Sequence, residues 1–196
     1  KLIFKRSWNT NIQIIKLGKM ITIIFPIGAP GSGKSLLGKR LARGEQINGL
    51  SISDYQEFHY CCRDDWFAEL KASGLGRNKI RRQLYDRLET FFREIRERAH
   101  TKSLLVYMDS CNAQRGGRES LVKRLGGSDG LVCKVIYANF IIPESILWSR
   151  TQEREDHPTF PSDLQEQLDI IRKVLSGIEY AGELELNENS QIWTLT

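Results

Sequence analysis

Residues 28–35 form a glycine-rich segment with the sequence Gly-Ala-Pro-Gly-Ser-Gly-Lys-Ser, and this segment limits the possible folds of the chain more than any other. At this spacing of two glycines before Lys-Ser, backbone N–H groups can turn inward and approach phosphate oxygens closely. An apolar, β-branched run, residues 20–26, precedes the segment, and a helical run, residues 36–43, follows it. This context indicates a phosphate-binding loop between a buried strand and a helix, and argues against a glycine-rich turn with a chance Lys-Ser.

The chemistry of this loop predicts how a nucleotide would be held. Lys34 would bring a mobile positive charge to the β- and γ-phosphates, and the Ser35 hydroxyl would bind Mg²⁺. ATP or GTP is the expected phosphate donor. The residues expected to bind it are Gly28, Ala29, Pro30, Gly31, Ser32, Gly33, Lys34, Ser35 and Leu36.

Apolar strand-like runs alternate with helical ones along the rest of the chain. Strands are expected at residues 20–26, 50–54, 103–108, 131–137 and 191–195, and helices at 36–43, 78–100, after 143, and from 162 to about 177. This alternation predicts an α/β fold of the P-loop NTPase type, a doubly wound and mostly parallel sheet flanked by helices. One kinase domain would occupy residues 20–196, and residues 1–19 would be a linker or the tail of an upstream domain.

Two aspartates follow predicted strands, where the carboxyl ends of parallel strands form a ligand crevice. Asp109 follows the strand 104–108 and is expected to hold Mg²⁺ directly or through water. Asp54 ends the short strand 50–54, and a carboxylate there can accept the proton of an attacking hydroxyl. The simpler alternatives are a capping role for Asp109 and a turn role for Asp54.

Two arginine pairs are candidates for contacts with phosphate. Arg150 and Arg154 are one helical turn apart, just before a helix-breaking segment, residues 155–161. This pattern predicts a helical lid whose arginines neutralise the transferred phosphoryl group. Arg115 and Arg118 follow Asp109 and could bind a substrate phosphate bidentately. The alternatives are surface arginines paired with nearby glutamates, and solvated loop arginines.

Composition and charge indicate which partners and which cellular compartment to expect. The chain has 196 residues and a net charge of +5, and residues 77–102 alone hold nine basic and four acidic groups. That excess suits a polyanionic partner, although a solvated helix face would have the same pattern. The early apolar run is far shorter than the ~20 residues of a membrane span, and residues 1–19 lack the apolar core of a signal peptide. We therefore expect a cytoplasmic protein with no membrane contact, whose four cysteines are reduced thiols.

Over residues 20–180 the chain resembles the P-loop polynucleotide 5′-kinases of RNA repair, namely the kinase domain of multidomain tRNA ligases and phage polynucleotide kinase. Besides the loop, the likeness is carried by Ser-Ile-Ser-Asp-Tyr at 51–55, Asp-Ser-Cys-Asn at 109–112, and Arg-x3-Arg at 150–154 followed by Asp-His. The resemblance implies that Asp54 is the general base. Gln56 and Glu57 occupy the place where phage-type kinases have a substrate-binding arginine, so Arg63, Arg115 or Arg118 is expected to supply that contact.

These observations predict a polynucleotide 5′-hydroxyl kinase that transfers the γ-phosphate of ATP or GTP to a 5′-OH end, with RNA favoured over DNA, as in RNA repair or tRNA splicing. Lys34, Asp54, Arg150 and Arg154 are its expected catalytic residues. The basic lead before Met20 is what a linker from an upstream ligase domain would look like. The alternative enzyme is a small-molecule P-loop kinase for a sugar, nucleoside or antibiotic. A nucleotide switch without phosphoryl transfer has less support, since binding alone needs neither a lid arginine pair nor a poised aspartate.

Overall fold

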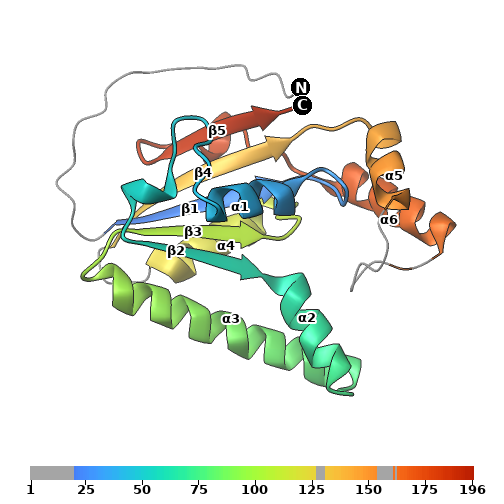
Figure 1. Ribbon diagram of the computed structural model, residues 1–196, viewed down its shortest axis with the longest axis horizontal. Helices are drawn as coiled ribbons and strands as arrows, with labels where there is room; N and C mark the ends of the chain where they lie inside the picture. The colour runs from blue at the N-terminus through green and yellow to red at the C-terminus, as the bar shows by residue number, and fades with distance from the viewer. Residues whose placement is uncertain (1–19, 127–130, 154–160, 162) are drawn as a thin grey trace.

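A five-stranded sheet forms the centre of the computed structural model, which describes residues 20–126, 131–153, 161 and 163–196 (Figure 1). Its strand order is β2-β3-β1-β4-β5, and every pair of neighbours is parallel. The strands are β1 (Met20–Ile27), β2 (Glu57–Cys62), β3 (Leu104–Asp109), β4 (Val132–Phe140) and β5 (Ser190–Leu195). The predicted doubly wound α/β sheet is confirmed, and it is parallel throughout.

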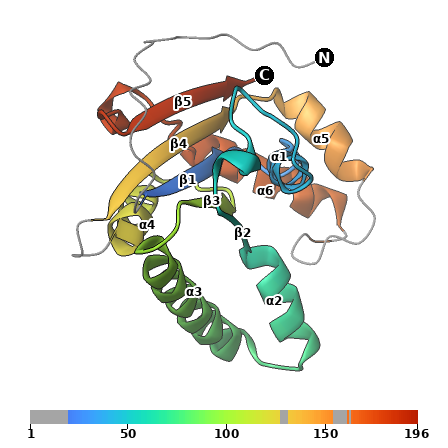
Figure 2. The same ribbon diagram turned by 60° about the vertical axis from the view of Figure 1, so that its left-hand side comes forward.

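Six helices flank the sheet in the described part of the chain. They are α1 (Lys34–Ala42), α2 (Arg63–Ala72), α3 (Arg77–Ala99), α4 (Arg115–Gly126), α5 (Glu144–Gln152) and α6 (Leu164–Gly177). Buried side chains of α3 and α4 pack on one face, and those of α1, α5 and α6 pack on the other. The turn between α2 and α3 projects away from the sheet, as both ribbon views show (Figures 1 and 2).

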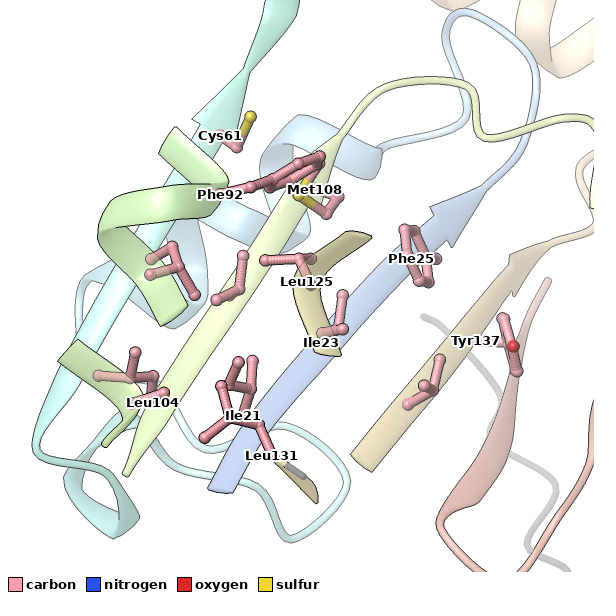
Figure 3. Close-up of a cluster of buried hydrophobic side chains, with 14 of the residues drawn as sticks. Ile21, Ile23, Phe25, Cys61, Phe92, Leu104, Met108, Leu125, Leu131 and Tyr137 are labelled. Atoms are coloured by element: carbon pink, nitrogen blue, oxygen red, sulfur yellow. The ribbon is translucent and has the colours of Figure 1, made fainter. Parts of the chain in front are cut away.

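The central strand β1 is buried on both faces, which explains its unbroken apolar sequence. Because side chains alternate along a strand, Ile21, Ile23 and Phe25 enter the cluster beneath α3 and α4 (Figure 3). Ile24 instead joins the cluster beneath α1. Helix α3 contributes Phe92 to the first cluster as a fully buried side chain, while the neighbouring Phe91 is only partly buried.

The predicted strand 50–54 is wrong. Residues Ile52–Asp54 form a turn of 3₁₀ helix, and the strand that pairs with β3 begins only at Glu57. The Ser51 Oγ accepts from the Ser53 N–H at 3.2 Å, and Asp54 Oδ2 accepts from the Ser51 N–H at 3.1 Å. These local side-chain hydrogen bonds compete with strand pairing and close the turn.

Two helices, α2 and α4, were not predicted, and at the remaining elements the differences are small. The N-cap of helix α6 is Asp163, one residue after the predicted start at 162, because the Asp163 side chain accepts from the Glu166 N–H at 2.8 Å. It ends at Gly177, as predicted. The predicted linker, residues 1–19, and most of the predicted lid, residues 154–160, lie outside the described residues.

Candidate functional site

The glycine-rich segment lies at the carboxyl end of β1 and leads directly into α1. Gly31 and Gly33 have φ values of +84° and +100°, a backbone conformation that side chains strongly disfavour. At Gly28 an added Cβ would lie 2.7 Å from Ser32 Oγ and 2.8 Å from Phe140 Cβ. The glycines are therefore required by the shape of the loop, which is the shape that brings N–H groups to a phosphate.

Lys34 is buried, with its ammonium group folded across the loop. Its Nζ donates to the carbonyl oxygens of Gly28 at 2.9 Å and Ala29 at 2.8 Å. Its own carbonyl accepts from the hydroxyl of Tyr107, a β3 residue, at 2.6 Å. The loop lysine is thus held from both its side chain and its backbone.

A pair of stacked tyrosines joins the loop helix to the sheet. The rings of Tyr60 and Tyr107 lie 5.6 Å apart and nearly parallel beneath α1. At Gly38, an added Cβ would approach the Tyr60 ring to 2.4 Å, so only glycine lets the helix pack this closely. The Tyr60 hydroxyl donates to Asp109 Oδ2, and burial, followed by this hydrogen bond, raises the pKa of Tyr60. Tyr60 therefore stays a neutral donor that orients the Asp109 carboxylate.

Asp109 and Ser35 have the chemistry of a magnesium site. Mg²⁺ prefers oxygen ligands and is usually held by one or two carboxylates together with substrate phosphates. Asp109 is the last residue of β3 and is buried, and Ser35 lies in the first turn of α1. Among the described residues no cluster of three or more His, Cys, Asp or Glu side chains could hold a metal by itself. The donor set fits an ion that is completed by nucleotide phosphates.

Asn112 ties the carboxyl ends of β1 and β3 together. Its Nδ2 donates to Pro26 O at 3.0 Å and to Met108 O at 2.8 Å, and its φ of +45° is one that asparagine tolerates. The Asp-Ser-Cys-Asn segment therefore positions Asp109 relative to the phosphate loop.

Asp54 does not reach this crevice, which corrects its predicted role as general base. It precedes β2, whose first residue Glu57 is in register with Leu104 at the start of β3. It therefore lies at the edge of the sheet where strands begin, opposite the phosphate loop, and its carboxylate caps its own turn. The carboxyl end of β2 instead leads into Asp64 and Asp65, two exposed residues in the first turn of α2.

Asp64 and Asp65 are candidate site residues that the sequence reasoning missed. Cys62 is in register with Asp109, so these carboxylates follow at the same edge as the predicted metal ligand. Arg63, a candidate for the substrate phosphate, begins the same helix and is exposed. The aromatic, β-prone run at 58–62, followed directly by Arg-Asp-Asp, was the signal that could have located them.

The predicted lid can be placed only in part. Helix α5 packs directly on the loop, since a Cβ at Gly31 would lie 2.9 Å from the Leu147 carbonyl oxygen. Arg150 Nη1 lies 3.5 Å from Gly31 O, so its guanidinium contacts the loop. Arg154 lies outside the described residues.

The other predicted arginine pair separates into two different roles. Arg118 is fully buried, with Nε 2.9 Å from Glu185 Oε2 and Nη1 2.6 Å from the Asn112 carbonyl oxygen. It cannot bind a substrate phosphate, and that prediction is wrong. Arg115 begins α4 near the crevice with a side chain that is 41% exposed, and it pairs with Glu119 at 2.6 Å. It stays a candidate.

A family model for the AAA domain, AAA_33, matches residues 23–176 and so covers most of the chain. The chain belongs to the AAA_33 family. No curated protein matches the sequence.

Solved structures similar to this AAA_33 domain include several kinases. A fungal RNA kinase has a TM-score of 0.54 at 14% identity, over 89% of this chain and 74% of that one. The Pnkp1/Rnl/Hen1 RNA repair complex has a TM-score of 0.53 at 14% identity, over 91% of this chain and 54% of that one. A putative kinase from Chloroflexus aurantiacus has a TM-score of 0.51 at 19% identity, over 90% of this chain and 86% of that one. At these identities the likeness shows the fold alone, which is that of P-loop kinases.

The cysteines of the AAA_33 domain are free thiols, including the adjacent pair at the end of β2. Burial raises the pKa of both Cys61 and Cys62 to about 12. They are therefore poor nucleophiles at neutral pH.

No helix of the described residues is long and apolar enough to cross a membrane.

Proposed function

We propose that this AAA_33 domain is a polynucleotide 5′-hydroxyl kinase that transfers the γ-phosphate of ATP or GTP to a 5′-OH end, with RNA favoured over DNA. The observation that carries the proposal is the order of strands at the crevice. Asp109 ends β3, which lies between β1 with the phosphate loop and β2 with Asp64 and Asp65. A donor over β1 and an acceptor over β2 would meet at Asp109.

On the donor side, the loop backbone and Lys34 bind the β- and γ-phosphates. The loop closes on itself through the Lys34 ammonium, so a bound phosphate would replace the carbonyl oxygens of Gly28 and Ala29 as its partner. Ser35 and Asp109 would hold Mg²⁺, which supplies charge neutralisation to the β- and γ-oxygens when bound. Tyr60 and Asn112 keep Asp109 in place for this role.

On the acceptor side, Asp64 replaces Asp54 as the proposed general base. Its carboxylate takes the proton of the 5′-hydroxyl as the new O–P bond forms and the bond from the γ-phosphorus to the bridging oxygen breaks. Asp65, whose side chain interacts with the Cys62 thiol, is the second candidate on the same turn. Arg63, on the same turn, is proposed to contact the substrate together with Arg115.

Above the loop, Arg150 and Arg154 are proposed to neutralise the transferred phosphoryl group. Positive charge placed where negative charge develops is among the largest contributions to such reactions. Support for Arg150 comes from its position beside Gly31. The role proposed for Arg154 rests on its spacing of one helical turn from Arg150.

Support for a polynucleotide acceptor comes from charge. Residues 77–102, most of which form α3, hold nine basic and four acidic groups. The fold likeness to RNA kinases agrees with this acceptor. The basic lead before Met20 is proposed to link to an upstream ligase domain.

The test is phosphoryl transfer from γ-labelled ATP and GTP to 5′-OH RNA and DNA oligonucleotides, beside sugars, nucleosides and aminoglycosides. We expect labelled 5′ ends and an acceptor KM that rises with salt, because binding a polyanion releases counterions. Labelling of a small molecule alone, with no salt dependence of KM, would show the alternative kinase.

A further inference from the structure

Helices α2 and α3 form a hairpin that starts at the proposed acceptor side of the site. Helix α2 leaves the carboxyl end of β2, and α3 returns beneath the sheet, so their connecting turn lies beyond the crevice edge (Figures 1 and 2). Gly74, with φ of +76°, reverses the chain there. Residues 74–79 line a hollow of about 420 Å³.

The end of this hairpin has an unusual charge. Residues 70–85 contain five basic side chains and no acidic one, and all five are exposed. We call this cluster the hairpin tip: Lys71, Arg77, Lys79, Arg81 and Arg82. Within the described chain, none of these five groups forms an ion pair.

Three of the four basic residues in the rest of α3 are bound to neighbouring elements. Arg87 forms a two-pronged pair with Glu69 at 2.7 and 2.8 Å, Arg96 donates to the Arg124 carbonyl oxygen at 2.6 Å, and Arg98 lies 3.2 Å from Glu57. These groups hold α3 to its neighbours. Apart from the exposed Arg93, the basic residues of α3 that form neither an ion pair nor such a hydrogen bond within the described chain therefore lie at the end nearest the crevice.

The hairpin tip also works against the stability of its own helix. The first turn of α3 has no acidic residue, although negative charge is the sign that stabilises a helix N-terminus. Arg77 and Arg81 are one turn apart, as are Lys79 and Arg82, and like charges at this spacing repel. These basic side chains lower the stability of their helix and form no ion pair within the described chain. Both properties are expected of a cluster that binds the phosphate groups of a partner.

We infer that the hairpin tip binds the phosphodiester backbone of the acceptor strand behind its 5′ end, an inference that rests on the proposed function. Helix α2 has ten residues, so about 15 Å separates Asp64 from the tip. At ~3.4 Å per nucleotide along a stacked strand, that distance spans about four phosphates. A dinucleotide is too short to reach the tip, whereas a dodecamer crosses it.

The test replaces Arg81 and Arg82 by glutamine together and measures kinetics with 5′-OH RNA acceptors of two lengths. We expect the KM of a dodecamer to rise about tenfold, with the KM of a dinucleotide changed less than about twofold. The slope of log KM against log salt should become shallower by about 1.4, since each lost single-strand phosphate contact removes about 0.7.

The matched control removes the same two charges elsewhere, by Arg93→Gln and Lys123→Gln, exposed residues of α3 and α4 toward the opposite edge of the sheet. This control variant should have the same KM for the dodecamer as the wild-type protein. Equal KM values in the two double variants would overturn the inference while leaving the kinase intact. If the wild-type chain labels no 5′-OH end, the proposed function fails and the inference falls with it.

Discussion

The Lys34 ammonium lies across the phosphate loop, where the carbonyl oxygens of Gly28 and Ala29 accept from it. Replacing Lys34 by alanine removes the positive charge that the γ-phosphate needs in the transition state. We expect phosphoryl transfer to fall at least ~10²–10³-fold, the loss typical of one preorganised donor. The buried carbonyls lose a partner as well, which should cost about 1–3 kcal/mol in free energy of unfolding.

Lys39→Ala is the matched control for that loss, because Lys39 is an exposed residue of the same helix. Turnover and thermal midpoint should both stay near wild type. Near-normal turnover in Lys34→Ala would remove the phosphate-loop assignment, whatever its effect on stability.

The two aspartate positions at opposite ends of β2 give a second test at single residues. Asp64→Asn should lower kcat about 10²–10⁴-fold, the range for loss of a general base. Asp54→Asn should turn over normally, because asparagine can accept the same hydrogen bond from the Ser51 N–H. Kinetics at saturating nucleotide compare them, with Asp65→Asn included. A defect confined to Asp54→Asn would restore the original assignment.

Among the elements, the start of β2 is tied to the end of α3 by a cluster of charges around Glu57. Its carboxylate accepts from Lys102, from His59 Nε2 at 2.9 Å and from Arg98 at 3.2 Å. The hydrogen bond from Lys102 contributes most to lowering the pKa of Glu57 to about 2. A depressed carboxyl pKa stabilises the fold above the unfolded-chain pKa of about 4.3, and this contribution is lost as pH falls toward 2.

We therefore expect Glu57→Gln to lower the thermal midpoint at pH 7. The difference from wild type should stay constant down to about pH 5 and shrink between about pH 5 and 2. Midpoints measured across this pH range check the prediction. A difference that persists unchanged at pH 2 would mean that Glu57 acts through packing and not through its charge.

At the scale of the whole molecule, Arg118 joins helix α4 to the C-terminal segment through Glu185, 67 residues away. Both side chains are buried, at 0% and 3% exposure. Arg118→Met would leave the Glu185 carboxylate unpaired, which should cost about 3–5 kcal/mol in free energy of unfolding. Denaturant unfolding measures this loss.

The double variant Arg118→Met with Glu185→Met separates pairing from packing. It should recover much of the lost stability, because two apolar groups of similar size can replace a buried ion pair. Unchanged stability in Arg118→Met together with weaker acceptor binding would return Arg118 to the substrate site.

The local pattern of the sequence was enough to predict the phosphate loop, four of the five strands and the helix end at Gly177. Each of these depends on residues that are neighbours in the chain, such as the glycines whose positive φ values shape the loop. The stacked Tyr60–Tyr107 pair was not predictable, since it joins two strands and a helix that meet only in the folded protein.

Local patterns were therefore sufficient to predict the class of fold and the phosphate-binding loop. Tertiary structure decided which end of a strand each carboxylate occupies, because that depends on the register of β2 with β3. It placed Asp54 at one edge and Asp64 at the other. It also decided that Arg118 is buried, because the partner that neutralises it lies 67 residues along the chain and no local spacing reveals that contact.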